Sequence, residues 1–146
     1  MKRRQFIATG AVCSAYFLSM SPERLFGAWK AKDFQQCTIE QAFMAALGTR
    51  MPVSSEKITI VAPPIAEDSS VVPVQVISSL KSEVLYLFAE KNVTPLVFKF
   101  TLQGNVLPWF SLNIKMKDSS TLYAVVKSEG IFFMTSVHVE IVAQAC

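Results

Sequence analysis

The chain has 146 residues, of which 51% are hydrophobic and 17% charged, so its composition excludes intrinsic disorder and suits one domain with a single core. Its formal net charge is +3, but the first 28 positions hold four of the 14 basic residues and only one of the 11 acidic residues. The remainder carries ten of each, and this balance excludes a strongly basic surface for nucleic acid or an anionic membrane.

The first segment has the features of an export leader. Lys2, Arg3 and Arg4 precede an uncharged stretch that extends from residue 5 to residue 22. A basic start followed by a short apolar segment is typical of a secretory leader, and the apolar part is too short for a stable membrane span. The arginine pair followed by Phe6 is similar to the twin-arginine export signal of bacteria, so we expect a periplasmic protein.

The leader is assigned to residues 1–31, although two cleavage positions fit. Ala28 and Ala31 are both candidates for its last residue. Cys13 lacks the upstream leucine of a lipid-attachment site, so we interpret it as part of the leader and not as a lipidated cysteine.

Residues 32–52 are predicted to hold one helix, from Thr38 to Leu47. Thr38 and Gln41 form a capping box, in which each side chain satisfies a free backbone amide of the first turn. Gly48 supplies the left-handed residue that ends the helix. The apolar face consists of Ile39, Ala42, Phe43, Ala46 and Leu47. Cys37, just before the cap, could pair with another thiol in an oxidising compartment.

The period of the apolar pattern then changes from helical to strand-like. Seven short strands are predicted, at 57–61, 72–76, 84–88, 96–102, 110–116, 122–126 and 131–141. Ser128-Glu129-Gly130 predicts a hairpin between the last two, and Pro73 predicts an edge strand or a bulge because proline cannot donate to a ladder. Short strands separated by turns indicate an antiparallel β-sandwich over residues 53–142. The first six strands contain no cysteine, so hydrophobic burial must stabilise the sandwich without an inter-sheet disulfide.

The strands carry more apolar surface than one small core needs. Trp109-Phe110 and the stretch 131–134 place large apolar side chains on both faces of their strands. One face is expected to join the core, and the other is expected to cover a partner, since aromatic residues and methionine are enriched in interfaces.

The remaining polar residues give no catalytic or metal-binding pattern. His138 is the only histidine, which excludes a site built on several histidines, and its place in the alternation favours a solvated or partner-facing side chain over a proton donor. Glu67 and Asp68 are interpreted as a solvated turn. The sequence has no Ser/His/Asp order, no Cys-x-x-Cys and no phosphate-binding glycine loop.

The last four residues are predicted to form a flexible arm that ends in a thiol. They are Ala143, Gln144, Ala145 and Cys146. From Val142 to Cys146 the chain could extend about 17 Å, and a thiol that does chemistry must be reachable. The alternative is a frayed terminus that happens to end in cysteine.

Several groups of residues, in this order and spacing, resemble the SoxY family of sulfur-carrier subunits in the periplasmic thiosulfate-oxidation (Sox) system. They are the twin-arginine leader, the helix ending at Gly48, Ile65–Asp68 with Val72–Val74, Glu90–Asn92 with Thr94-Pro95, and Val125–Lys127 with Gly130 and the tail cysteine. The resemblance implies an immunoglobulin-like β-sandwich that forms a heterodimer with a SoxZ-like subunit. It also implies that Cys146 carries thiosulfate-derived sulfur, which SoxAX-, SoxB- and SoxCD-like enzymes load and oxidise in turn.

The tail departs from the family pattern Gly-Gly-Cys-Gly-Gly. Gln144 and Ala145 replace the preceding glycines and narrow the backbone freedom of the arm. The α-carboxylate on Cys146 itself is expected to disfavour the thiolate and to repel anionic thiosulfate. Two alternatives to a carrier therefore stay open: a binding module that keeps the SoxZ-type surface without transferring sulfur, and a thiol–disulfide enzyme that uses Cys37 and Cys146.

Overall fold

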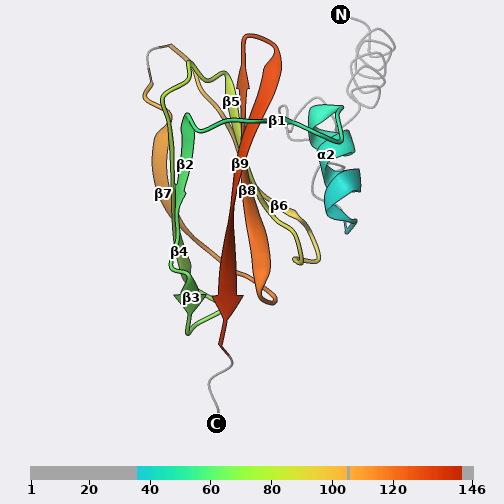
Figure 1. The fold of residues 1–146 in the computed structure, drawn as a ribbon, viewed down its shortest axis with the longest axis vertical. Coiled ribbons are helices and arrows are strands. Elements are labelled where there is room, and N and C mark those ends of the chain that lie inside the picture. The colour runs from blue at the N-terminus through green and yellow to red at the C-terminus, as the bar shows by residue number, and fades with distance from the viewer. Residues whose placement is uncertain (1–35, 105, 143–146) are drawn as a thin grey trace, which may run out of the picture. The chain divides into compact units, whose positions relative to one another are not determined.

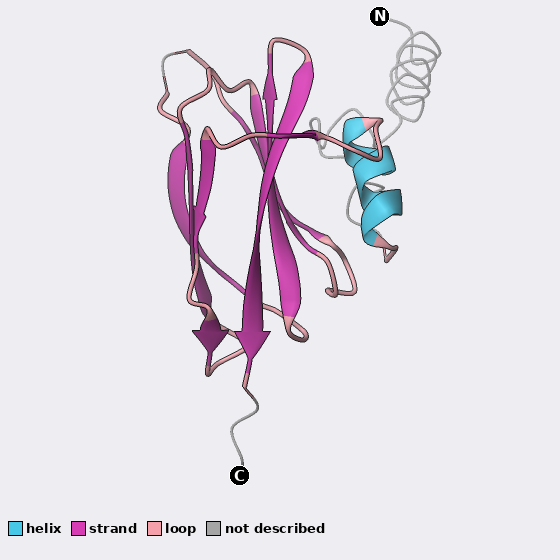
Figure 2. Cartoon of the chain, in the orientation of Figure 1, coloured by secondary structure: helices cyan, strands magenta, loops and turns pink. Residues whose placement is uncertain are grey.

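The structure, a computed structural model, describes residues 36–104 and 106–142. The elements in this part of the chain are α2 (Ile39–Leu47), β1 (Val53–Ser54), β2 (Ile58–Val61), β3 (Ile65–Ala66), β4 (Val72–Ser78), β5 (Val84–Ala89), β6 (Leu96–Thr101), β7 (Trp109–Ile114), β8 (Ser120–Ser128) and β9 (Ile131–Ile141). Strands dominate (Figure 2), which confirms the mainly β prediction. The predicted leader, 1–31, and the predicted arm, 143–146, lie outside the described residues. Within the described ranges, no helix has the length and apolar character to cross a membrane.

The predicted helix is confirmed together with both of its end signals. The side chain of Thr38 accepts a hydrogen bond from the backbone N–H of Gln41, and the side chain of Gln41 accepts one from the backbone N–H of Thr38. Gly48 ends the helix with φ 73°, a left-handed conformation that costs glycine little because it has no Cβ. Thus α2 begins and ends where its own sequence directs.

The seven predicted strands form two sheets, which Figure 1 shows side by side. The larger sheet has the order β1-β9-β8-β5-β6, and the smaller has the order β2-β4-β7. The smaller sheet thus holds the first, second and fifth of the seven predicted strands, and the larger sheet holds the third, fourth, sixth and seventh. This is the division of strands found in an immunoglobulin-like sandwich. The β8–β9 hairpin turns through Glu129 at φ 52° and Gly130 at φ 78°, the two positive angles of a type I′ turn.

Two short strands were not predicted, and they make the sandwich partly parallel. Both β1 and β3 pair in parallel with β9, β1 opposite Phe133 and Met134 and β3 opposite Glu140 and Ile141. The seven predicted strands pair antiparallel with one another, as expected, and the parallel pairing is confined to these two additional strands. A two-residue strand is too short to show a periodicity. Its pairing is made by backbone groups, which the sequence pattern does not reveal.

The edge-strand expectation for Pro73 is also wrong, since β4 is the middle strand of the smaller sheet. The neighbouring strand β2 ends at Val61, opposite Gln75. Pro73 lies beyond that point and pairs only with Asn113 of β7. The proline is tolerated in a central strand because the ladder on its other side has already ended.

The larger sheet is buried on both faces, so the molecule has three layers with the sheet in the middle (Figure 1). Alternate residues of β5 divide between two cores: Leu85 and Leu87 pack against the smaller sheet, whereas Tyr86 and Phe88 pack against α2. The expectation that a partner covers the second face of 131–134 is corrected here. Phe132 and Met134 pack into the cluster beneath the protein's own helix.

Phe43 is the central contact of α2 with the larger sheet. Its side chain is 5% exposed, and its ring lies edge-on to Phe88 at 4.8 Å and to Tyr123 at 5.6 Å between centroids. We expect Phe43→Ala to lower the free energy of unfolding by about 3–5 kcal/mol, because it removes a buried aromatic ring and leaves a cavity. Met44→Ala, at the next position and 44% exposed, is the control and should cost about 0.5 kcal/mol or less. Urea denaturation followed by circular dichroism measures both, and equal costs would show that α2 does not fold cooperatively with the sheet.

Candidate functional site

The end of β9, residues Glu140–Val142, is where the chain leaves the sandwich toward Cys146, and we name it the arm root. Its backbone is held from both sides. Glu140 N–H donates to Pro64 O (2.9 Å) and Val142 N–H donates to Ala66 O (3.1 Å) on the β3 side. Ile141 N–H donates to Ser119 Oγ (2.8 Å) on the other side.

These hydrogen bonds fix the point from which the arm departs. It lies at the end of the sandwich opposite the β8–β9 hairpin (Figure 1). Val142 is the last described residue and is exposed. The predicted carrier residue Cys146 and the arm residues Ala143, Gln144 and Ala145 lie outside the described residues, as do the export-signal residues Arg3, Arg4 and Phe6, so their roles stay predictions.

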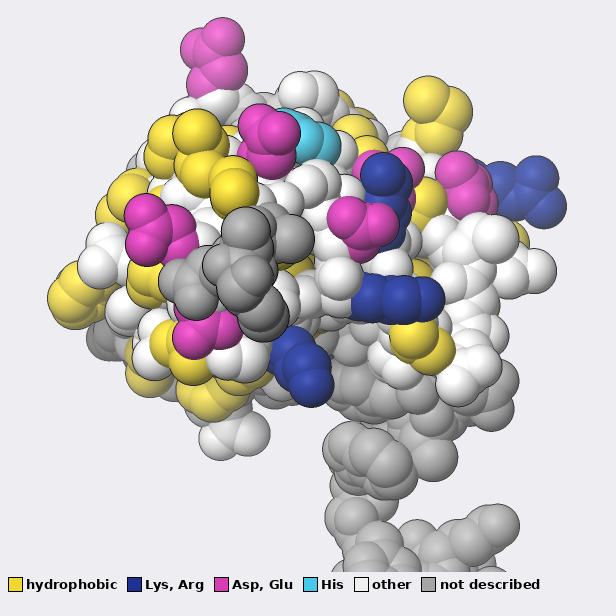
Figure 3. All heavy atoms as spheres, turned by 90° about the horizontal axis from the view of Figure 1, so that it is seen from below, with side chains coloured by type: hydrophobic (Ala, Val, Ile, Leu, Met, Phe, Trp, Pro, Cys, Tyr) yellow, Lys and Arg dark blue, Asp and Glu magenta, His cyan; other side chains and the backbone are white. Residues whose placement is uncertain are grey.

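Charged side chains of both signs surround this end of the sandwich (Figure 3). Glu67 follows β3 directly, and Glu140 lies in the arm root; both are exposed. Asp68 accepts hydrogen bonds from the hydroxyl and the backbone N–H of Ser70, and these hold the pKa of its carboxyl below the usual value. Asp68 is therefore ionised at neutral pH and will repel an anion brought close to β3.

The sequence-based interpretations of the polar residues agree with this geometry. His138 and Glu140 are exposed while Val139 between them is buried, so the histidine is solvated as predicted. Glu67 and Asp68 are both exposed in a turn. In residues 36–104 and 106–142, no cluster of three or more histidine, cysteine or acidic side chains could hold a metal ion.

Cys37 has the environment of a packed residue rather than of a nucleophile. It is half-buried and packs against the cluster between α2 and the larger sheet. Burial raises the pKa of its thiol, which lowers the thiolate fraction at neutral pH. This disfavours the thiol–disulfide enzyme that would use Cys37.

Two hollows lie at opposite ends of the sandwich. One, of about 820 Å³, is lined by the β4–β5 and β6–β7 loops and by Glu129 of the hairpin, far along the strands from the arm root. The other, of about 470 Å³, is lined by Ser69, Asn92, Val93, Thr94, Lys115, Met116 and Lys117. The larger hollow is remote from the arm, whereas the smaller lies beside the loops that hold the arm root.

Sequence reasoning missed the residues that anchor the arm root. Ser119 is 22 positions from Ile141 along the chain and gave no motif. Ile65 and Ala66 were noted only as part of the family resemblance, but the backbone of Ala66 accepts the last described hydrogen bond of the chain. The proline pair that precedes β3 was a usable signal, since it ends β2 and redirects the chain toward β9.

Comparison with known proteins identifies a family. The family model described as "Sulfur oxidation protein SoxY" matches residues 43–146. Among solved structures, the sulfur carrier protein SoxY from Chlorobium limicola f thiosulfatophilum is similar, with a TM-score of 0.65 and 29% sequence identity. The alignment covers 72% of this chain and 96% of that one. The curated proteins contain no significant match.

Removing the Ser119 hydroxyl should loosen the arm root without unfolding the sandwich. We expect Ser119→Ala to weaken the local structure by about 1 kcal/mol, because Ile141 N–H loses its acceptor, and so to speed exchange of that amide about fivefold. Ser136→Ala, at an exposed position on β9, the strand that contains Ile141, is the matched control and should leave the exchange rate of the Ile141 amide unchanged. Hydrogen exchange followed by NMR measures both; an unaltered Ile141 rate in Ser119→Ala would remove Ser119 from the anchor.

Proposed function

This chain belongs to the SoxY family of sulfur oxidation proteins, and from that premise we propose that it carries sulfur covalently on Cys146 while partner enzymes oxidise it. The single observation that best supports the proposal is the arm root. A backbone anchored on both edges as far as Val142 gives a fixed base for four further residues, which reach about 13 Å. The sandwich is the scaffold, and the thiol is the substrate-bearing group.

The loading step is an oxidation. The Cys146 thiol and the outer sulfur of the thiosulfate dianion form a new S–S bond, giving a cysteine S-thiosulfonate and releasing one proton and two electrons. By family resemblance a haem enzyme of the SoxAX type accepts the electrons. Water then attacks the sulfonate sulfur and breaks its bond to the sulfane sulfur, which releases sulfate and leaves a cysteine persulfide for further oxidation. No step requires a catalytic group on this chain, so the proposed role is that of a carrier and not an enzyme.

The proposed setting is the bacterial periplasm, with a SoxZ-like subunit as the stable partner and SoxAX-, SoxB- and SoxCD-like enzymes as transient ones. The basic leader with Arg3, Arg4 and Phe6 supports the compartment. A covalent carrier needs no bound cofactor of its own.

The test of the proposal compares two cysteines of the same chain. In a thiosulfate-oxidising strain whose own copy is deleted, Cys146→Ser should abolish thiosulfate consumption, because an alcohol forms no S–S bond. Cys37→Ser should support consumption at the wild-type rate, since this thiol packs beside α2. Consumption that continues with Cys146→Ser would favour the binding module that keeps its partner but transfers no sulfur.

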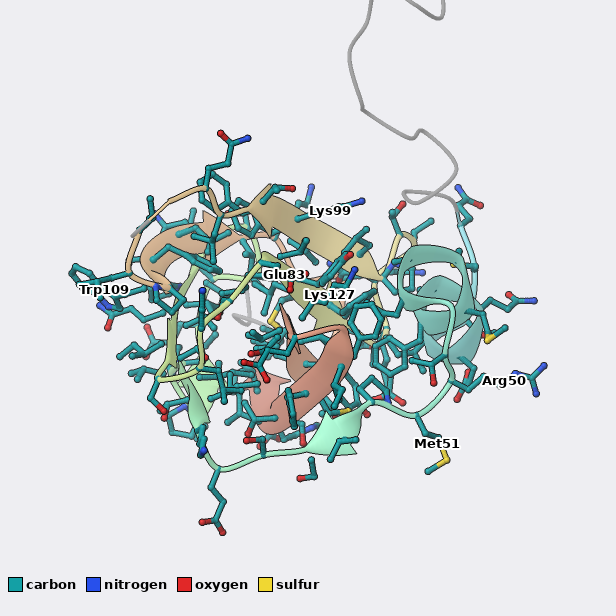
Figure 4. The ribbon with its side chains drawn as sticks, turned by 90° about the horizontal axis from the view of Figure 1, so that it is seen from above. Arg50, Met51, Glu83, Lys99, Trp109 and Lys127 are labelled. Carbon is teal, nitrogen blue, oxygen red and sulfur yellow. The ribbon has the colours of Figure 1, made fainter. Side chains whose placement is uncertain are left out.

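The partner surface is proposed on the outer face of the smaller sheet. Trp109 is 60% exposed and lies on the side of the domain away from α2 (Figure 4), and it pairs across strands with Ile77, which is 40% exposed. Buried aromatic anchors dominate interface energies.

We therefore expect Trp109→Ala to weaken binding of a SoxZ-like subunit by about 2 kcal/mol or more, roughly thirtyfold in Kd. Met44→Ala, at an exposed position of α2 on the far side of the larger sheet, is the control. Isothermal titration calorimetry measures both, and an unchanged Kd for Trp109→Ala would move the interface elsewhere.

A further inference from the structure

The smaller hollow, which we name the lysine pocket, lies in the loops at the end of the sandwich that carries the arm root. Asn92 joins two of its walls: its side-chain Nδ2 donates to Lys115 O (2.9 Å), and its Oδ1 accepts from Lys117 N–H (2.8 Å). Met116 N–H donates to Ser69 O (2.8 Å), which joins the third wall. The backbone around the pocket is therefore fixed by three hydrogen bonds between loops.

Lys115 and Lys117 give the pocket its charge. They flank Met116, which is buried, and both are exposed, the alternation expected of an extended segment. The lining includes these two lysines and no carboxylate. Neither ammonium group forms an ion pair with any carboxylate in the described ranges. The hydroxyl of Thr94 adds a hydrogen-bond donor to the lining.

The residues that anchor the arm root lie close along the chain to the walls of the pocket. Ser119, which holds Ile141, is two residues from Lys117, at most about 7 Å along the backbone. Ala66, which holds Val142, is three residues from Ser69, at most about 11 Å. The four residues beyond Val142 span up to about 13 Å, more than the backbone length that separates either anchoring residue from its wall of the pocket.

The charges around the arm root favour placement of an anionic group toward the lysine pocket. Glu67 and Glu140 lie on the β3 side and repel it, whereas the lysine pocket attracts it. Asp118 lies between the pocket and the arm root, but its carboxylate accepts the backbone N–H of Ser119 (2.8 Å).

We propose that the lysine pocket binds the sulfonate group of the loaded arm, that is, the −SO₃⁻ of the S-thiosulfonate on Cys146, between Lys115 and Lys117. The inference rests on the proposed function, because only a loaded Cys146 bears a sulfonate. Binding would hold the loaded arm against its own sandwich between enzymes and shield its S–S bond from stray thiols. The unloaded thiol has no sulfonate to be held, so the pocket distinguishes the two states of the carrier.

The experiment uses the exported protein with Cys37→Ser, so that Cys146 is the thiol to be modified. Tetrathionate loads it without an enzyme: the thiolate attacks a central sulfur, forms the S-thiosulfonate and expels thiosulfate. Intact mass spectrometry confirms loading. NMR then compares the backbone amides of loaded and unloaded protein, and a separate sample of unloaded protein with free thiosulfate distinguishes the arm's sulfonate from a free oxyanion.

Loading should shift the amides of Val93, Thr94 and residues 115–117, and the shifts should disappear in Lys115→Gln/Lys117→Gln. The matched control is Lys57→Gln/Lys81→Gln, which removes the same charge at the opposite end of the sandwich. Lys81 lines the larger hollow there, and Lys57 O accepts a hydrogen bond from the neighbouring Ser79 N–H. A small thiol such as glutathione attacks the Cys146 sulfur, forms a mixed disulfide and expels thiosulfate. This reaction should be about two- to tenfold faster in the pocket variant than in wild type or control, the range expected for two exposed ion pairs. Added salt should reduce the difference.

The outcomes separate the inference from the function on which it rests. Loading without shifts at these amides, or equal release rates in all three proteins, would overturn the pocket and leave the carrier intact. Equal shifts with free thiosulfate and unloaded protein would assign the pocket to a free anion and overturn the arm as its occupant. Failure of tetrathionate to load Cys146 in the folded protein would contradict the proposed function and the pocket together.

Discussion

Hydrogen bonds on both edges of the last residues of β9 are the constraint on which the functional argument depends. The backbone N–H groups of Glu140 and Val142 donate to carbonyls on the β3 side, and that of Ile141 donates to the Ser119 hydroxyl, so the chain is anchored on both edges as far as Val142. A carrier needs a fixed base, because only then does the reach of the arm define which surfaces its terminal thiol can meet. The short parallel strand β3 provides one side of that base, although it contributes little to the cores.

The two-sided burial of the larger sheet explains why such a base is rigid. The smaller sheet covers one face and α2 covers the other, so β5 and β8 lie between two apolar layers. β9 pairs with β8 from Ile131 to Val139. An arm root attached to this strand therefore shares the stability of the whole domain.

Sequence patterns predicted the elements whose information is local. The capping box of Thr38 and the left-handed Gly48 defined α2, and alternation found all seven longer strands. The same patterns could not show that α2 covers the second face of 131–134, because the periodicity tells which residues are buried and not what buries them. The arm root was equally hidden, since its anchors are backbone groups and a serine 22 residues away. The proposed role of Cys146, by contrast, rests on the sequence and its family resemblance.

The most direct test of the central claim is intact-protein mass spectrometry of this protein isolated from the periplasm of cells growing on thiosulfate. The account predicts a population in which Cys146 carries added sulfur, removable by reductant and absent from cells grown without a sulfur source to oxidise. A mature protein bound to its SoxZ-like partner, with Cys146 unmodified throughout growth on thiosulfate, would contradict the account.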